Sequence, residues 1–205
     1  GDMVSGSRRA SEHIKQLRKW KVLMDSYKMP VYCVPSNHVI QSEMSEDIFR
    51  SVFEMPENGP DGFKELAYSF DHKGAHFVGI DTEEYNNFHD IGEEQFNWLR
   101  QDLGQNEKRI VFVFGHDPAY PVSRHKFNSL DKVSSKRDDI WSLVKNFDVE
   151  AYFCGHEHLY NKSLHDGVYQ IISGGGGGGL VESPEKGGFH HFVIVDVTDG
   201  GACGI

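Results

Sequence analysis

The chain has 205 residues and a formal net charge of −10, with 38% hydrophobic and 25% charged residues. These values are typical of a globular domain that buries a sizeable core. The acidic charge argues against a nucleic-acid partner because phosphates would be repelled, and no apolar run reaches the roughly 18 residues of a membrane-spanning helix, so no membrane partner is expected.

The N-terminal part of the chain is expected to hold two helices and one strand. Apolar residues recur at three-to-four spacing over 8–28, which predicts an amphipathic helix that Pro30 ends. The short apolar run 31–34 predicts a buried strand, and residues 45–53 predict a short helix.

The rest of the chain alternates between strand-like and helix-like patterns. Two β-rich runs, 67–71 and 75–81, flank Lys73-Gly74 and predict a hairpin, and an amphipathic pattern predicts a helix over 92–103. This alternation predicts an α/β fold in a single domain, 1–205, without internal repeats. The further expected elements are strands at 110–114, 151–154, 168–172 and 192–197, and a helix at 138–147.

Polar motifs follow three of the expected strands at the point where each strand ends. They are Ser36-Asn37-His38, Gly115-His116-Asp117-Pro118 and Gly155-His156-Glu157-His158, and Gly1-Asp2 opens the chain. Because ligands of open α/β folds bind at the carboxyl ends of strands, we expect these loops to converge. Imidazole and carboxylate groups bind zinc, iron or manganese, so their convergence predicts a metal site.

The spacing of the last motif favours two ions rather than one. His156 and His158 are two residues apart, a spacing that need not aim both rings at a single ion. A carboxylate such as that of Asp2 can bridge two ions. Ions about 3.5–4 Å apart can clamp the attacking and leaving oxygens of a displacement and lower the pKa of bound water to about 7.

With 12 histidines in the chain, each motif is weak alone, and the weight lies in their order and spacing. The ordered set resembles the motifs of the calcineurin-like metallophosphoesterase superfamily. Tyr68-Ser69-Phe70, 77–81 and 95–103 also resemble its purple-acid-phosphatase-like and cyclic-nucleotide-phosphodiesterase-like branches, so the resemblance covers nearly the whole chain. It implies two mixed β-sheets packed face to face with flanking helices, and hydrolysis of a small phosphorylated substrate.

The resemblance implies a metal-binding role for five residues. Asp2 would bridge two metal ions, which would be manganese, iron or zinc. Asn37, His116 and His156 would complete one site with Asp2, and His158 would belong to the other. The family pattern starts with an earlier strand that ends in Asp-x-His, for which this sequence has no counterpart. We therefore expect an N-terminally truncated domain whose second site is incomplete, so that this chain alone would hold one ion or none.

The catalytic residue implied by the resemblance is His38, which would stabilise charge or protonate the leaving oxygen, while a metal-bridging hydroxide attacks phosphorus. Three positions depart from the family pattern. Ser36 replaces the usual glycine, and Val39 replaces an acid that would orient His38. Ser5 stands where purple acid phosphatases place an iron-binding tyrosine, which disfavours a purple iron site.

These departures leave an alternative open, namely a catalytically impaired fragment or a non-enzymatic binding protein that keeps the fold. The branch resemblance leans towards an exported protein, and the sequence leaves monoesterase and diesterase activity equally open.

Several other residues lie near the motifs or share their residue type. The glycine run 174–179 is expected to form a loop whose backbone packs closely near the site. Tyr120, Arg124 and His125 follow the His116 motif and would either reach the substrate or lie in a solvated loop. Four histidines without a surrounding motif are expected on the surface: His13, His72, His89 and His165.

Overall fold

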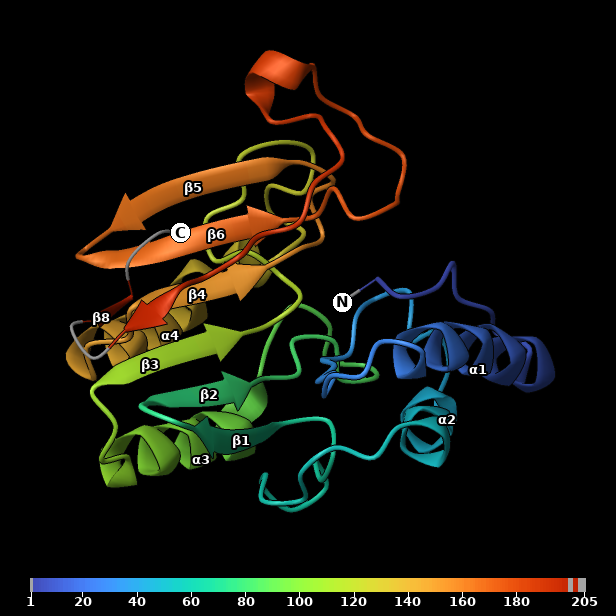
Figure 1. The fold of residues 1–205 in the computed structure, drawn as a ribbon, viewed down its shortest axis with the longest axis horizontal. Helices are drawn as coiled ribbons and strands as arrows, with labels where there is room; N and C mark the ends of the chain where they lie inside the picture. The colour runs from blue at the N-terminus through green and yellow to red at the C-terminus, as the bar shows by residue number, and fades with distance from the viewer. Residues whose placement is uncertain (1, 199–200, 203–205) are drawn as a thin grey trace.

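The computed structural model describes residues 2–198 and 201–202. A six-stranded mixed sheet in the order β1-β2-β3-β4-β6-β5 forms the centre (Figure 1). A two-stranded ribbon, β7 (Val197–Thr198) and β8 (Gly201–Ala202), accompanies it. The strands of the large sheet are β1 (Tyr68–His72), β2 (Ala75–Gly79), β3 (Ile110–Phe114), β4 (Ala151–Cys154), β5 (Tyr160–His165) and β6 (Val168–Ser173).

The four inner strands determine where polar loops meet. Strands β2, β3, β4 and β6 run parallel, while β1 and β5 pair antiparallel at the two edges. Strand β3 has the sequence Ile-Val-Phe-Val-Phe and is almost wholly buried, as a strand covered on both faces must be. The carboxyl ends of the parallel strands therefore lie along one edge of the sheet, and the loops that leave them lie side by side.

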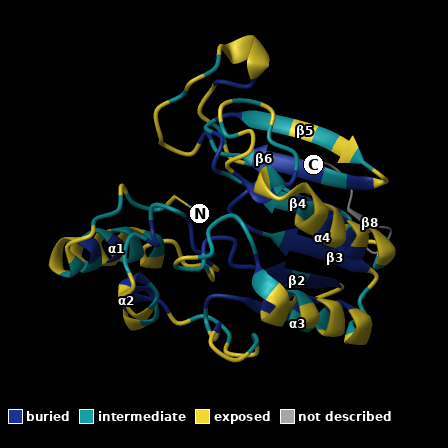
Figure 2. Ribbon diagram, turned by 180° about the vertical axis from the view of Figure 1, so that it is seen from behind, coloured by how far each residue is buried: buried dark blue, intermediate teal, exposed yellow. Residues whose placement is uncertain are grey.

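Two helices cover one face of the sheet, and two others lie beyond the carboxyl ends of its parallel strands. Helices α3 (Gly92–Gln105) and α4 (Ser134–Asn146) pack on the sheet through Leu99, Leu103 and Trp141, which are at most 3% exposed. Figure 2 shows the inner strands buried and the outer sides of these helices exposed. Helices α1 (Ala10–Asp25) and α2 (Ser45–Val52) pack against each other beyond the strand ends (Figure 1). Short 3-10 helices occupy Leu130–Lys132 and Pro184–Lys186.

The opposite face of the sheet carries an extended segment rather than a full second sheet. Val193 and Val195 pack on the aromatic side chains of this face, whereas Phe192 and Ile194 are 80% and 67% exposed. The segment is extended, but no described strand pairs with residues 192–196, so the strand predicted over 192–197 is wrong except at its end. The mixed α/β architecture with flanking helices is as predicted, while the second sheet comprises only β7 and β8 among the described residues.

Two further elements differ from the sequence prediction. Residues 31–34 form no strand, because no described strand lies alongside them; the Cys33 carbonyl instead accepts a hydrogen bond of 2.9 Å from Tyr68 Oη. Strand β5 was not predicted. It pairs with β6 through Asp166 and Gly167, whose φ angles of 51° and 91° suit the tight hairpin turns that Asp-Gly favours. The other predicted helices and strands are confirmed, with ends that differ by a few residues.

Two further features of the fold concern membrane-spanning helices and cysteines. No helix among the described residues is long and apolar enough to cross a membrane. Cys33 and Cys154 are buried free thiols, and Cys203 lies outside the described residues.

Candidate metal centre

The two histidine motifs lie side by side at the carboxyl ends of β3 and β4. The parallel pairing of these strands continues into the loops, where the Gly155 N–H donates to the His116 carbonyl over 2.9 Å. His156 has a φ of 63°, in the left-handed region that few non-glycine residues adopt. This turn lets the chain reverse within the motif. Both imidazoles are buried, with His116 1% and His156 3% exposed.

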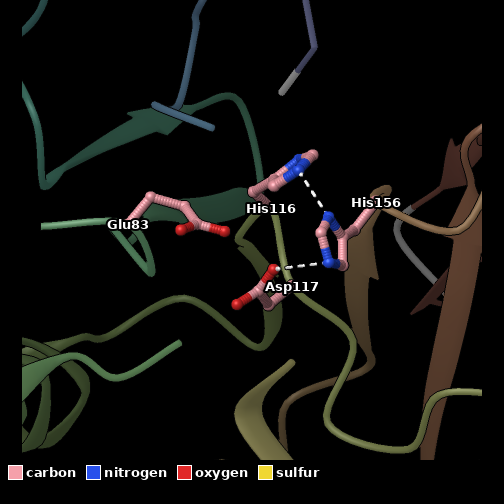
Figure 3. A group of neighbouring side chains, drawn as sticks. All are labelled: Glu83, His116, Asp117 and His156. Atoms are coloured by element: carbon pink, nitrogen blue, oxygen red, sulfur yellow. Dashed lines mark hydrogen bonds and ion pairs between the residues drawn. The ribbon is translucent and has the colours of Figure 1, made fainter. Parts of the chain in front are cut away.

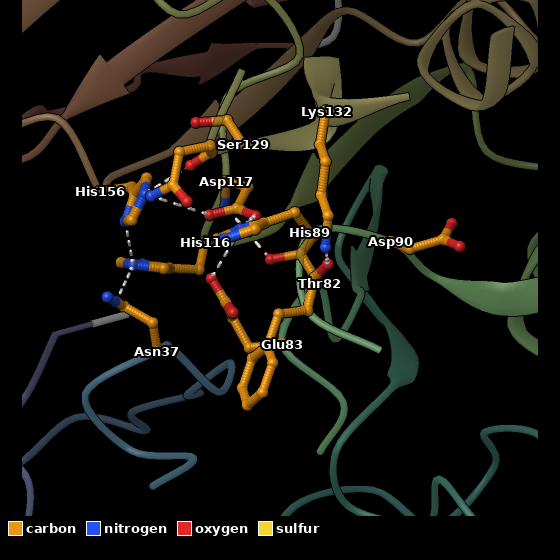
Figure 4. A network of polar contacts seen from close by, with 12 residues as sticks. Asn37, Thr82, Glu83, His89, Asp90, His116, Asp117, Ser129, Lys132 and His156 are labelled. Carbon is orange, nitrogen blue, oxygen red and sulfur yellow. Dashed lines mark hydrogen bonds and ion pairs between the residues drawn. The ribbon is translucent and has the colours of Figure 1, made fainter. Parts of the chain in front are cut away.

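Donor atoms from separate parts of the chain converge on the Nε2 atom of His116. Asn37 Oδ1 lies 2.9 Å and His156 Nδ1 3.2 Å from it (Figure 4). Asp2 Oδ1 lies 3.5 Å from the same atom. The second carboxylate oxygen of Asp2 lies 3.7 Å from Nε2 of His158. The Asp2 carboxylate thus stands between His116 and His158, which is the position that a bridging ligand needs. The structure therefore brings together all five residues predicted to bind metal, and their role as ligands remains a prediction.

In His156 and His158, the hydrogen bond made by one ring nitrogen shows that the other nitrogen is free to bind a metal ion. His156 Nε2 lies 2.9 Å from the Asn128 carbonyl, and His158 Nδ1 lies 2.8 Å from the Gly179 carbonyl. A carbonyl only accepts hydrogen bonds, so each of these nitrogens carries the proton and donates. In a neutral ring the other nitrogen carries the lone pair, and Nδ1 of His156 and Nε2 of His158 are the atoms that face the other candidate donors.

The protonation of the buried histidines suits metal binding. Burial lowers the pKa of His116 well below its ordinary value and, reinforced by the nearby His125, lowers the pKa of His156 to about 3. Both rings are therefore neutral at pH 7, which is the form that binds metal ions. Lone pairs of neutral imidazole, amide and carboxylate groups then face one another with too few protons to join them all. A cation resolves this arrangement, so the donor set fits a metal ion.

A second group of potential donors lies deeper and shares both histidines. Glu83, His116, Asp117 and His156 are all buried, and each offers an atom within 4.8 Å of the others (Figure 3). His89 joins this group, since its Nδ1 lies 2.7 Å from Asp117 Oδ2 and 3.6 Å from Glu83 Oε1. Burial, reinforced by the neighbouring carboxyl of Asp117, raises the pKa of Glu83 to about 10, and burial raises that of Asp117 well above its ordinary value.

Access distinguishes the two groups. Asp2 and His158 border an open cavity of about 1080 Å³, whereas Glu83 and Asp117 are fully buried behind the histidines. A substrate that enters the cavity therefore meets the outer group. Their raised pKa values favour the protonated forms of the inner carboxyls in the metal-free protein, and Asp117 Oδ1 lies 3.9 Å from His156 Nε2. The cavity continues away from the candidate donors along an aromatic surface formed by Phe70, Phe77 and Phe153.

His38 also borders this cavity, and a backbone group orients it. Its Nδ1 donates a hydrogen bond of 2.9 Å to the Ser5 carbonyl, which leaves Nε2 as the free nitrogen. The Ser5 carbonyl thus orients the His38 ring in place of an acid. Val39, which stands where the resembled family has that acid, is 0% exposed in the core. The catalytic role of His38 remains a prediction.

The glycine run packs tightly against the histidine motif, as expected from the sequence. A Cβ atom on Gly174 would lie 1.9 Å from the Glu157 carbonyl oxygen, and one on Gly178 would lie 2.6 Å from the His158 ring. These glycines therefore allow the loop to approach the candidate centre more closely than any other residue would.

Sequence reasoning missed the inner carboxyls and misplaced two histidines. Asp117 belongs to a quoted motif, but only the fold shows that it faces Glu83 from another loop. His13 and His89 were expected on the surface; His13 is 0% exposed and the His89 side chain 11%, because each packs against a distant segment. An acid beside a motif histidine was the available signal for Asp117.

Of the three residues singled out after the His116 motif, one packs against the core and two lie at the candidate metal centre. Tyr120 packs on Trp141 and stacks on His165, with its ring centroid 3.9 Å from that of His165, so it belongs to the core. Arg124 and His125 lie at the candidate centre. The His125 ring centroid is 3.8 Å from that of His156, and Arg124 Nη2 is 3.5 Å from His158 Nδ1.

Comparison with known proteins adds a family assignment to this geometry. The family model described as calcineurin-like phosphoesterase matches residues 1–160. Acid phosphatase type 7 of Mus musculus is 28% identical over 161 residues, which are 71% of this chain and 35% of that protein. Purple acid phosphatase 23 of Arabidopsis thaliana is 26% identical over 141 residues, 66% of this chain and 30% of that protein. The chain thus spans about a third of the length of these relatives.

Solved structures support the fold. Purple acid phosphatase PPD1 from seeds of yellow lupin (Lupinus luteus) has a TM-score of 0.66 and 16% identity, with 84% of this chain and 36% of that chain covered. The structure of PhoD has a TM-score of 0.52 and 14% identity, with 67% and 34% covered. At these identities the likeness extends to the fold alone.

Proposed function

The chain belongs to the calcineurin-like phosphoesterase family, and from this premise we propose that it is the hydrolytic part of a metal-dependent enzyme acting on a small phosphorylated substrate. The observation that carries the proposal is the convergence of Asp2, Asn37 and His156 on the Nε2 atom of His116. These residues come from four separate loops, and their donor atoms meet beside an open cavity.

Two ions of the zinc, iron or manganese class fit this arrangement. Asp2, Asn37, His116 and His156 would hold one ion, and Asp2 with His158 would hold the other. Once bound, the ions would polarise the phosphoryl oxygens and lower the pKa of a water molecule to about 7, so that hydroxide is available as the nucleophile. Burial keeps the His156 ring neutral, and the Asn128 and Gly179 carbonyls orient the rings of His156 and His158.

The leaving oxygen needs a proton, and His38 is placed to give one. Its Nδ1 proton is committed to the Ser5 carbonyl, so Nε2 is the atom that would donate to the substrate from the imidazolium form. A carbonyl holds the ring without the charge of an acid.

Metal analysis combined with hydrolysis of generic esters tests the proposal. We expect the whole enzyme of which this chain is the hydrolytic part, once loaded with manganese or zinc, to hydrolyse p-nitrophenyl phosphate or bis(p-nitrophenyl) phosphate, and the relative rates to identify the ester class. His116→Ala should lose both bound metal and hydrolysis. His72→Ala changes an exposed histidine and should keep both. Absence of hydrolysis of either ester by metal-loaded wild-type protein contradicts the proposal.

A binding protein that keeps the fold without catalysis is the second candidate. The observation that favours it is that Val39, buried in the core, stands where the resembled family has an acid that orients the catalytic histidine. A binding protein would retain one metal equivalent or none and would hydrolyse neither ester. Two equivalents with hydrolysis would exclude it.

A further inference from the structure

Glu157 lies between the two histidines of its motif, yet its side chain faces a different loop. It is 0% exposed, and both of its carboxylate oxygens accept backbone hydrogen bonds. Oε2 lies 2.7 Å from the Val122 N–H nitrogen, and Oε1 lies 2.6 Å from that of Ser123 and 3.3 Å from that of His125. A side chain of the second histidine loop thus holds the loop that follows the first.

Burial of the Glu157 carboxylate costs free energy unless its hydrogen bonds are formed. A buried carboxylate loses its hydration, and charge-assisted hydrogen bonds from three amides offset that loss. The amides belong to residues 119–129, a stretch without helix or strand, so its conformation depends on contacts of this kind. A second contact joins the same loop to the segment after the glycine run, since Ser123 Oγ donates to Glu182 Oε1 over 2.5 Å.

The loop held in this way carries a cation to the candidate metal centre. Arg124 lies among the three bonded amides, and its Nη2 atom is 3.5 Å from His158 Nδ1. That nitrogen already donates its proton to the Gly179 carbonyl, so it accepts nothing from Arg124. Arg124 Nε donates to His125 Nε2 over 2.9 Å, and no described carboxylate forms an ion pair with Arg124. Guanidinium N–H groups therefore remain available for a ligand.

Charge favours an anion as that ligand. The chain has a net charge of −10, so a phosphorylated substrate needs local positive charge to bind. A guanidinium group matches the oxygens of a phosphoryl group geometrically, and its affinity depends on being held at a fixed position. Arg124 is exposed at the centre, while the Glu157 carboxylate that fixes its backbone is buried.

We propose that Arg124 binds a phosphoryl oxygen of the substrate and that Glu157 is a positioning residue that holds Arg124 there through the backbone of residues 122–125. This inference rests on the proposed function. It assigns to the middle residue of the histidine motif a task distinct from metal binding, because Glu157 acts through another loop.

Amide exchange and phosphate binding together test the proposal. Hydrogen–deuterium exchange over residues 122–125 is measured in metal-free protein, and binding of inorganic phosphate is measured by calorimetry in manganese-loaded protein. The variants are Glu157→Gln, Glu157→Ala, Arg124→Ala and the double variant of both alanine changes. Glu46→Gln is the matched control, because Glu46 also accepts a backbone hydrogen bond, of 3.1 Å from Tyr85 N, away from the candidate centre.

We expect Glu157→Ala to speed exchange of these amides by about tenfold or more, and Glu157→Gln to do so less while keeping the fold. Phosphate affinity should fall about tenfold in Arg124→Ala and by a similar factor in Glu157→Ala, with no further loss in the double variant. Metal content should stay unchanged in all of them, and Glu46→Gln should match wild type.

Unchanged exchange over 122–125 in both Glu157 variants would overturn the positioning role. Undiminished phosphate affinity in Arg124→Ala, or additive losses in the double variant, would overturn the link to the substrate. Failure of metal-loaded wild-type protein to bind phosphate would count against the proposed function and the role of Arg124 together. The exchange result would still decide whether Glu157 fixes the loop.

Discussion

Two buried histidine clusters lie at different parts of the sheet, and their electrostatics are opposite. On β2, His76 Nδ1 lies 2.7 Å from Asp71 Oδ1 and Nε2 lies 2.9 Å from Asp102 Oδ2. Burial lowers the pKa of His76, but the two carboxylates outweigh burial and raise it overall. At the candidate metal centre, burial lowers the pKa values of His116 and His156, and no carboxylate raises either pKa enough to offset burial.

The difference teaches how to tell a structural histidine from a candidate ligand. Burial is similar in the two clusters, with His76 7% and His156 3% exposed. The partners differ, because both ring nitrogens of His76 face acceptors, which suits a protonated ring. Around His116 the lone pairs of other donors face a neutral ring, and only a cation from outside the chain would satisfy them all.

The largest effect that separates the clusters is expected in metal affinity. His116→Ala removes the ring on which the other donors converge, so we expect affinity for manganese or zinc to fall by more than about 100-fold. His76→Ala should leave it unchanged. Competition titration with a chelator measures both variants. Equal affinities in the two variants would contradict the assignment of the candidate centre.

For the free energy of unfolding, in contrast to metal affinity, the larger effect is expected at His76. His76→Ala leaves Asp102, which is 14% exposed in its side chain, without its imidazole partner, and we expect the free energy of unfolding to fall by about 2 kcal/mol. His72→Ala, an exposed position on the same hairpin, should cost about 0.5 kcal/mol or less. Urea denaturation in the presence of a chelator measures both. A loss no larger than that of His72→Ala would remove the structural role of His76.

Glu83 offers a test of the inner carboxyls behind the candidate centre. Its pKa in the folded protein is raised to about 10, so folding favours its protonated form. The stability that this group contributes is complete below its ordinary pKa of about 4.5 and is lost as the pH rises towards 10. Glu83→Gln mimics the protonated acid and should escape this loss.

We therefore expect Glu83→Gln to be more stable than metal-free wild type at pH 8, and we expect this difference to shrink towards pH 5. Thermal unfolding at the two pH values with a chelator present provides the measurement. A wild-type protein that gains stability between pH 5 and pH 8 relative to the variant would show that Glu83 is ionised when folded.

The smallest expected effect is the pH dependence that His76 itself contributes. Its raised pKa means that this stabilisation is complete below the ordinary pKa of about 6.5 and disappears as the pH rises through the folded value. His76→Gln should flatten the stability curve near neutral pH, whereas wild type should become less stable as the pH rises there. Parallel curves for the two proteins would mean that His76 stays neutral when folded.

Much of the candidate site was predictable because its residues follow buried strands. An apolar run such as 110–114 indicates a central strand, and parallel strands bring the residues after their carboxyl ends together. Asp2, Asn37 and His158 came from the order of the motifs in the resembled family. Their convergence depends on topology that the motif order implies but does not show.

The missed features depend on contacts between distant segments. Nothing local to Glu83 indicates that it faces Asp117, since 33 residues separate the two in sequence. Likewise, residues 31–34 and 192–196 have the composition of strands, yet a strand also needs a neighbour, and none is described beside them. Strand β5 was a different failure, because its Asp166-Gly167 turn was a local signal that went unused.

The glycine run 174–179 is a uniform repeat in sequence but holds positions of very different mutational tolerance. A Cβ on Gly174, Gly175 or Gly178 would overlap neighbouring backbone or histidine rings, whereas Gly176 and Gly179 face open space. An alanine scan of this repeat should therefore be tolerated best at Gly176 and Gly179 and worst at the three obstructed positions, while Gly177 is strained by its φ of 153°. Substitutions can therefore accumulate only at the permitted positions. The spacing of the three obstructed glycines keeps the loop in register with the histidine motif.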